Sequence, residues 1–231
     1  MQWQLTLTLK IIFHYPGPLF SETDTGEKKR PKKILEAFKL LNYDVTILAG
    51  TYSERIELFL QIKKNISQFK FIYSENSNLP LSTTGNRRFP NFNSVDYQLF
   101  KLAKEFNIPN GVFIRDVFWK VKDTAHAKAL HKRILGNILF NHEVKHYYQN
   151  CSTIFLPTES CKSYLPPTMY QNFHLLSPGA ETVNFHKEAP KEIKKLIYVG
   201  SCKPPVYQVV NGFKAILDCP NIHLTIVTRT N

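Results

Sequence analysis

The stretch LTLKIIFHYPGPLFSETDTGEKKRPKKILEAFKLLNYDVTILAG, residues 7–50, decides the fold class. It opens and closes with short apolar runs, LTLKIIFHY and DVTILAG, which are typical of buried strands. Between them, apolar residues recur at the spacing of one helix face: Ile34, Leu35, Phe38 and Leu41. Pro31 suits a first helical turn, where its missing N–H would be unpaired anyway, so we expect a helix that begins near Arg30.

The same alternation continues along the chain. Further apolar runs predict strands in FKFIYSE (69–75), GVFIRDVFW (111–119), STIFLPT (152–158) and FHLLSPG (173–179). Helical periodicity is found between them, at residues 52–66, 94–107 and about 124–148. We therefore expect an α/β domain with a parallel sheet and crossover helices. Residues 77–92 form the one long loop, and such loops gather at the carboxyl ends of strands, where ligands bind.

A polar stretch that contains Pro190 separates this domain from a shorter one. We place the first domain at residues 1–185, a linker at 186–194, and the start of a second domain at 195–231. The second segment contains one strand, one helix and one strand, in KLIYVGS, PVYQVVNGFKAIL and NIHLTIVTR. A unit of that size buries too little surface to offset its chain entropy, so we expect this second domain to be incomplete.

The net charge of the chain limits the classes of molecule that it is expected to bind. The chain has 30 Lys and Arg against 18 Asp and Glu, a formal net charge of +12. This excess favours nucleic acid, acidic lipid or phosphorylated small molecules. Because no nucleic-acid-binding module is recognisable, nucleic acid is the least favoured of the three.

The cysteine spacing and the hydropathy of the chain indicate in which cellular compartment to expect the protein. The four cysteines are too widely spaced for paired metal ligands and do not suggest a disulfide framework, which favours a reducing cytoplasm. The opening residues lack the features of a signal peptide, and no apolar run is long enough to span a bilayer. Any membrane contact is therefore expected to be peripheral.

The basic stretch at residues 28–33 is a candidate phosphate site. It follows a strand and a loop with Gly26, and it leads into a helix, whose N-terminal N–H groups favour an anion. Lys28, Lys29 and Arg30 would add positive charge there. Neither a Walker P-loop nor the dinucleotide-binding fingerprint is present. The alternative is that these charges are only a solvated helix start.

HEVKH, from His142 to His146, matches the zinc-protease pattern of two histidines one helical turn apart with a glutamate between them. A third ligand should follow on another helix, but the chain soon enters the strand STIFLPT. We therefore expect no metal. The basic and histidine-rich side of this helix either contacts anionic lipid or is a plain surface.

Charged residues at two strand ends are candidates for contact with a substrate. Arg115 and Asp116 follow the apolar run GVFI, and Glu75 closes FKFIYSE. Such residues either line a site or pair with one another. We favour site lining, because ligands collect at the carboxyl ends of parallel strands.

Taken together in order, several segments resemble bacterial family 4 (group 1) glycosyltransferases of polysaccharide biosynthesis. The segments are the basic stretch with its flanking strands, FKFIYSEN, GVFIRDVFW, FLPTESCKSYLP, LLSPGAE and KLIYVGS, and they span nearly the whole chain. The resemblance implies the GT-B architecture: a Rossmann-like, doubly wound acceptor domain and a second Rossmann-like donor domain, here incomplete. It also implies sugar transfer with retention from a nucleotide sugar, without a metal or another cofactor. The implied acceptors are glycans or lipid-linked glycans at the inner face of the membrane.

The resemblance also implies roles for particular residues. The loop at 21–30, with Gly26, Lys28, Lys29 and Arg30, matches the loop that approaches the donor phosphates. Gly200 matches the glycine at the start of the donor domain, with Lys203 beside it as a possible phosphate contact. Within this frame, acceptor contacts and catalysis are expected at Asp116, Arg115 and Glu75.

The chain departs from the family pattern in its donor half. The family carries two glutamates separated by seven positions, and the nearest pair here, Glu181 and Glu188, has six residues between them and lies in the linker. We therefore expect a truncated glycosyltransferase that is weak or inactive alone, or one completed by a second polypeptide. The alternative is a non-catalytic partner subunit or a protein that binds anions or glycans, which would expose a large apolar patch.

Overall fold

A computed structural model of the chain describes residues 8–20, 26–85, 89–120, 130–179, 194–200, 209–217 and 219–228. The chain divides into two compact units. The first comprises Met1–Val117 and Ile134–Pro178, and the second comprises Phe118–Arg133 and Gly179–Asn231. Residues 186–193 of the predicted linker lie outside the described residues.

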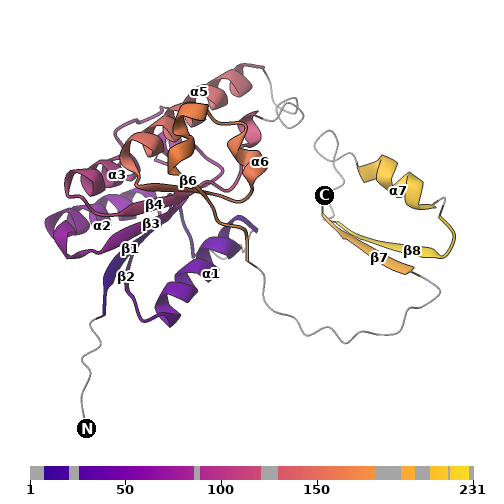
Figure 1. Cartoon of the computed structure of the whole chain (residues 1–231), viewed down its shortest axis with the longest axis horizontal. Helices are drawn as coiled ribbons and strands as arrows, with labels where there is room; N and C mark the ends of the chain where they lie inside the picture. Colours follow the sequence, from indigo (N-terminus) through magenta and orange to yellow (C-terminus); the bar gives the residue numbers. More distant parts are fainter. Residues whose placement is uncertain are drawn as a thin grey trace, which may run out of the picture. The chain divides into compact units, whose positions relative to one another are not determined.

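The first unit is built on a six-stranded sheet (Figure 1). Its strands are β1 (Lys10–His14), β2 (Asp44–Leu48), β3 (Phe71–Glu75), β4 (Asn110–Phe113), β5 (Thr153–Leu156) and β6 (Phe173–Leu175). All neighbouring strands are parallel, in the order β2-β1-β3-β4-β5-β6. This confirms the predicted α/β class and is consistent with a Rossmann-like sheet.

Helices connect these strands. The α-helices are α1 (Gly26–Leu40), α2 (Tyr52–Lys64), α3 (Val95–Glu105), α5 (Leu130–Asn150) and α6 (Glu159–Lys162). Short 3-10 turns are η1 (Ile66–Gln68), η2 (Leu81–Thr83), η3 (Phe118–Lys120) and η4 (Pro167–Asn172). Figure 1 shows α1 on one side of the sheet and α2, α3 and α5 on the other. Among the described helices, none has the length and apolarity that crossing a bilayer requires.

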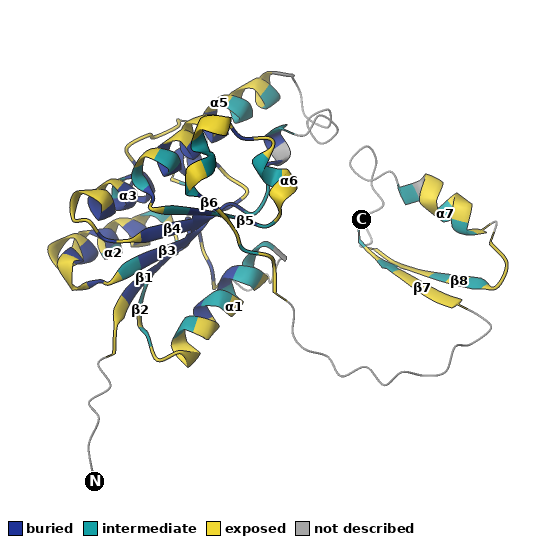
Figure 2. Cartoon of the chain, viewed as in Figure 1, coloured by how far each residue is buried: buried dark blue, intermediate teal, exposed yellow. Residues whose placement is uncertain are grey.

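Two apolar clusters, one on each face of the sheet, form the core. Beneath α2 and α3, one cluster joins strand and helix residues that include Ile12, Leu48, Phe59, Ile72 and Leu99. Beneath α1, the other joins Phe13, Leu35, Tyr73 and Phe113. Successive residues of a strand point to opposite faces, and both faces are covered at the centre of β1, so its residues Ile11, Ile12 and Phe13 are all apolar and buried. Figure 2 shows the central strands buried and the outer helix faces exposed.

Helix α1 begins at Gly26, four residues before the predicted start near Arg30, and Pro31 lies inside it. The expectation that proline marks the first turn was therefore wrong. A proline inside a helix removes one donor, here the N–H that would bind the carbonyl of Glu27 four residues earlier. That carbonyl accepts a hydrogen bond from Arg115 Nη1 at 3.4 Å instead. The helix thus continues through Pro31 with a substitute donor.

The segment predicted as one long loop, residues 77–92, is partly folded. It contains η2, whose three residues are buried, although residues 86–88 lie outside the described part of the chain. The Asn91 N–H donates to the carbonyl of Ser82 at 2.7 Å, which ties the two arms of the segment together. Its first half therefore belongs to the packed interior.

The second unit is small. In its described part, β7 (Lys194–Val199) and β8 (Ile222–Val227) form a parallel pair, and α7 (Val209–Leu217) lies between them in sequence. Several apolar side chains of these elements are exposed: Leu196, Ile197, Val199, Leu217, Ile226 and Val227. A two-stranded sheet has too few strands to bury an apolar face by itself.

Candidate functional site

Polar residues gather where β3, β4 and α1 meet. Glu75 is the last residue of β3, and Arg115 and Asp116 follow the end of β4 at Phe113. Because the strands are parallel, these carboxyl ends share one edge of the sheet. We call this group, together with Glu27 and Arg30 of α1, the carboxyl-edge site.

The lower layer of the carboxyl-edge site is largely buried. Arg30 Nη1 contacts Glu75 Oε1, and the side chains are 17% and 2% exposed, respectively. The Tyr73 hydroxyl donates to the same carboxylate oxygen at 2.8 Å. The Arg30 guanidinium also lies 3.4 Å above the centre of the Phe113 ring, a cation–π contact. Arg30 and Glu75 therefore neutralise each other inside the protein.

The upper layer is open to solvent. Arg115 contacts Asn78 Oδ1 through Nη2, and its Nη2 lies 3.8 Å from Glu27 Oε1. Its Nε lies 3.7 Å from Asp116 Oδ2. Exposed fractions are 25% for the Arg115 side chain, 26% for Glu27 and 47% for Asp116. These three charged groups are held in place and still reach water.

Glu27 connects the layers of this site. Asn78 donates to its carboxylate twice, from the backbone N–H and from Nδ2, each at 2.9 Å. The Tyr15 hydroxyl donates to Oε1 at 3.3 Å. Burial, followed by the charge of Glu27, raises the pKa of Tyr15, so this phenol stays a donor at neutral pH.

The upper layer can bind a polar ligand with several hydroxyl groups. Carboxylates of Glu27 and Asp116 accept hydrogen bonds from hydroxyls, and the Arg115 guanidinium donates to oxygen or to an anion. Glu75 could reach a ligand only if Arg30 moved aside, because its side chain is almost fully buried.

The structure brings four predicted residues together at this edge: Glu75, Arg115, Asp116 and Arg30. Gly26 is the first residue of α1, and Lys28 and Lys29 lie in its first turn, where Lys29 is exposed. Phosphate binding by these residues stays a prediction.

Two predicted donor contacts belong to the second unit. The Gly200 N–H, just after β7, donates to the carbonyl of Val227 at 3.0 Å. Lys203 lies outside the described residues.

Sequence reasoning missed one member of the carboxyl-edge site, Glu27, and two hydrogen-bond partners of its carboxylates, Tyr73 and Asn78. Glu27 directly precedes the basic stretch at residues 28–33, and this contrast in charge could have drawn attention to it. Tyr73 reads as an ordinary core residue, and Asn78 reads as an ordinary loop residue, so the sequence offered no signal for either.

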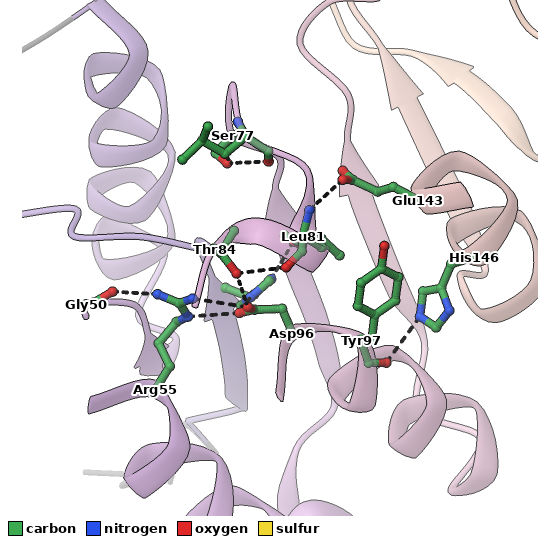
Figure 3. A network of polar contacts seen from close by, with 12 residues as sticks. Gly50, Arg55, Ser77, Leu81, Thr84, Asp96, Tyr97, Glu143 and His146 are labelled. Carbon is green, nitrogen blue, oxygen red and sulfur yellow. Dashed lines mark hydrogen bonds and ion pairs between the residues drawn. The ribbon is translucent and has the colours of Figure 1, made fainter. Parts of the chain in front are cut away.

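A second polar network is buried near α2 and α3 (Figure 3). Asp96, fully buried at the start of α3, accepts from Arg55 Nε at 2.9 Å and Nη2 at 3.1 Å, and from the Thr84 hydroxyl at 2.8 Å. His14 Nε2 lies 3.0 Å from the same carboxylate, and its Nδ1 lies 2.7 Å from Ser74 Oγ. Burial alone would raise the pKa of Asp96, but the His14 and Arg55 contacts lower it. The network is fully satisfied and has a structural role.

Glu143 of α5 is buried on the same side of the sheet. Its Oε2 accepts the Leu81 N–H at 2.7 Å, and its Oε1 accepts the Tyr147 hydroxyl at 2.8 Å. Burial outweighs these hydrogen bonds and raises the pKa of Glu143 to about 7. Glu143 therefore anchors η2 to α5.

The histidines of HEVKH do not converge on a metal position. His146 Nε2 lies 3.1 Å from the carbonyl of Tyr97 and donates to it, and Asn150 Nδ2 lies 3.3 Å from His146 Nδ1. His142 Nδ1 lies 3.4 Å from the Tyr97 hydroxyl. Within the described part of the chain, no three His, Cys, Asp or Glu residues form a group that could hold a metal ion. The zinc-protease pattern therefore has no geometric support here.

Comparison with known proteins leaves the function to be argued from the residues themselves. No protein-family model matches the sequence, and no curated protein matches it significantly.

Proposed function

We propose that this chain is the acceptor-side part of a retaining, nucleotide-sugar-dependent glycosyltransferase of bacterial surface polysaccharide, such as capsule or lipopolysaccharide. One observation carries the proposal: Glu27, Arg115 and Asp116 form a fixed, half-exposed polar surface at the carboxyl edge of a parallel sheet. In such sheets this edge is where ligands bind. The sequence resemblance to family 4 glycosyltransferases supplies the reaction.

In this proposal the two layers of the carboxyl-edge site have different roles. Asp116 and Arg115 contact the acceptor, because they are exposed and already oriented. Glu75 is a positioning residue that holds Arg30 against Phe113.

The donor contacts are proposed from the resemblance. Gly26, Lys28 and Lys29 face the donor phosphates from the start of α1, where backbone N–H groups favour an anion. Gly200 and Lys203 contribute from the second unit. The donor is a nucleotide sugar, and no metal is required.

The sequence of the donor domain determines how much activity we expect from this chain. The family pattern of two glutamates is missing from this sequence. Transfer needs fixed groups that stabilise the charge developing on the donor, so we expect weak or no activity from this chain alone. In this proposal a second polypeptide supplies the two glutamates that this sequence lacks. A lipid-linked acceptor would place the protein on the cytoplasmic face of the membrane, in peripheral contact with anionic lipid.

The test is transfer from a panel of UDP- and GDP-sugars to a lipid-linked acceptor, first with this chain alone and then with the product of a neighbouring reading frame. We expect transfer with the partner, and loss of that transfer in Asp116→Asn. Asp44→Asn is the control, because Asp44 is exposed at the far end of β2. Absence of transfer in both arrangements would contradict the proposal.

A non-catalytic partner subunit is the second candidate, and the exposed apolar residues of the second unit favour it. Ile197 and Val199 of β7 are 68% and 71% exposed, and Leu217 of α7 is 78% exposed. Such a surface is typical of one that other strands or helices cover. If the chain forms a stable complex that transfers sugar equally well with Asp116→Asn, the subunit role is the correct one.

A further inference from the structure

A basic groove lies between α3 and α5, on the outer side of the helices. It has a volume of about 590 Å³. Its lining includes three lysines, two histidines, one aromatic ring and two amides: Lys101, Lys104, Lys145, His142, His146, Phe92, Gln149 and Asn150. No carboxylate lines the groove. We call it the α3–α5 groove.

Its positive charge is largely uncompensated. Neither Lys101 nor Lys145 has an ion-pair partner among the described residues. Lys104 Nζ donates to the carbonyl of Gln149 at 2.7 Å, and an ammonium group has three donors, so two remain. Ammonium groups from two helices face one cavity, and an anion between them would relieve their repulsion.

The positive charges of the groove lysines also affect the pKa values of the two groove histidines. Burial, followed by the charges of Lys145 and Lys101, lowers the pKa of His142. Lys101 also contributes to the lowered pKa of His146, after burial. The Tyr97 hydroxyl faces His142 from α3, and Glu143, which is buried next to it in sequence, turns away toward Leu81. Positive potential is therefore concentrated inside the groove.

The shape of the α3–α5 groove also suits a bound ligand. The Phe92 ring lies 4.4 Å from the His142 ring, centre to centre, and forms a partly exposed apolar wall. A concave site with one apolar wall and several convergent polar groups is typical of small-molecule binding. A solvated lysine surface would be flat and would usually carry acidic residues as well.

We propose that the α3–α5 groove binds a phosphate-bearing ligand through Lys101, Lys104 and Lys145. This site is separate from the carboxyl-edge site and does not rest on the proposed sugar transfer. Lysine is a compact point charge that suits a phosphate group, either of a soluble compound or of a lipid head group.

The first experiment is calorimetric titration of the full chain with inorganic pyrophosphate. We expect saturable binding that weakens about tenfold in Lys101→Gln and in Lys145→Gln, since a hydrogen-bonded charge is lost in each. Lys64→Gln is the matched control, because Lys64 is exposed on α2. All three variants should keep the wild-type melting temperature, which separates lost binding from lost folding.

A second arm distinguishes the sources of the phosphate. Cosedimentation compares vesicles of phosphatidylglycerol and phosphatidylcholine with vesicles of phosphatidylcholine alone. Binding to the anionic vesicles that is lost in the two groove variants would identify a lipid head group. Pyrophosphate binding without vesicle binding would identify a soluble ligand. Equal binding by wild type and groove variants in both arms would overturn the proposal. So would tight binding of a single-stranded oligonucleotide that displaces pyrophosphate.

Discussion

Replacing Glu143 with glutamine should change how stability depends on pH. Glu143 is 2% exposed, and its two carboxylate oxygens bind the Leu81 N–H and the Tyr147 hydroxyl. Burial raises its pKa from the ordinary 4.5 to about 7. The folded protein therefore holds a proton on Glu143 over a pH range in which the unfolded chain has released it.

The direction of the effect follows from this difference. The stabilisation is fully present below the unfolded pKa of 4.5 and is lost as the pH rises through about 7. Each unit of pKa difference corresponds to about 1.4 kcal/mol, so the loss is on the order of 3 kcal/mol. Glutamine resembles the protonated acid in shape, and its carbonyl oxygen can still accept the Leu81 N–H. The variant should not show this loss.

The assay is urea denaturation of wild type and Glu143→Gln between pH 4.5 and 8.5. The stability of the variant relative to wild type should rise by roughly 3 kcal/mol across this range. Subtracting the two curves cancels the contributions of other groups, including His146. Glu57→Gln, at an exposed position of α2, is the control and should run parallel to wild type. Parallel curves for Glu143→Gln as well would refute the buried, raised-pKa assignment.

Three further predictions concern stability and use the same denaturation measurement. Asp96→Ala should lower the free energy of unfolding by about 3–5 kcal/mol, because it leaves a buried guanidinium unpaired; Asp44→Ala, at an exposed position, should change it by less than about 0.5 kcal/mol. Burial lowers the pKa of His146 to about 4, so the stability of wild type relative to His146→Gln should rise by on the order of 3 kcal/mol between pH 4 and 6.5; the opposite contribution of Glu143 is common to both proteins and cancels in this difference. Gly50→Ala should cost about 1–3 kcal/mol because its φ is 120°, whereas Gly136→Ala, inside α5 with open space around the new Cβ, should add about 0.5–1 kcal/mol.

The fold could be predicted because its signals are local. A strand buried on both faces reads as a continuous apolar run, and each of the six runs predicted in the first unit overlaps one of the six strands. The start of α1 was predicted wrongly because it depends on a contact with a residue that is distant in sequence. Pro31 is accommodated because Arg115, far away in sequence, binds the carbonyl that the proline leaves without a donor.

The candidate site could be predicted only in part. Parallel strands end at one edge, so the positions of Glu75, Arg115 and Asp116 follow from the strand assignment alone. The ion pairs of this site could not be predicted in the same way, because they depend on which side chains meet in the folded protein. Nothing in the sequence indicates that Arg30 turns inward to Glu75 while the lysines beside it do not. The HEVKH segment shows the converse: it fits a metal-binding pattern, but Glu143 accepts the Leu81 N–H and His146 contacts the Tyr97 carbonyl, in line with the expectation that it binds no metal.

The carboxyl-edge site and the α3–α5 groove could each bind an anion, but they differ in the ion pairs that binding would break. At the carboxyl-edge site, Arg30 already has a carboxylate partner in a nearly buried contact, and giving it up would leave Glu75 charged and unpaired. In the α3–α5 groove, Lys101 and Lys145 give up no ion pair when an anion arrives, at least among the described residues. An anion at the carboxyl edge should therefore be bound by backbone N–H groups and by Lys28 and Lys29, with Arg30 held back as support for the site.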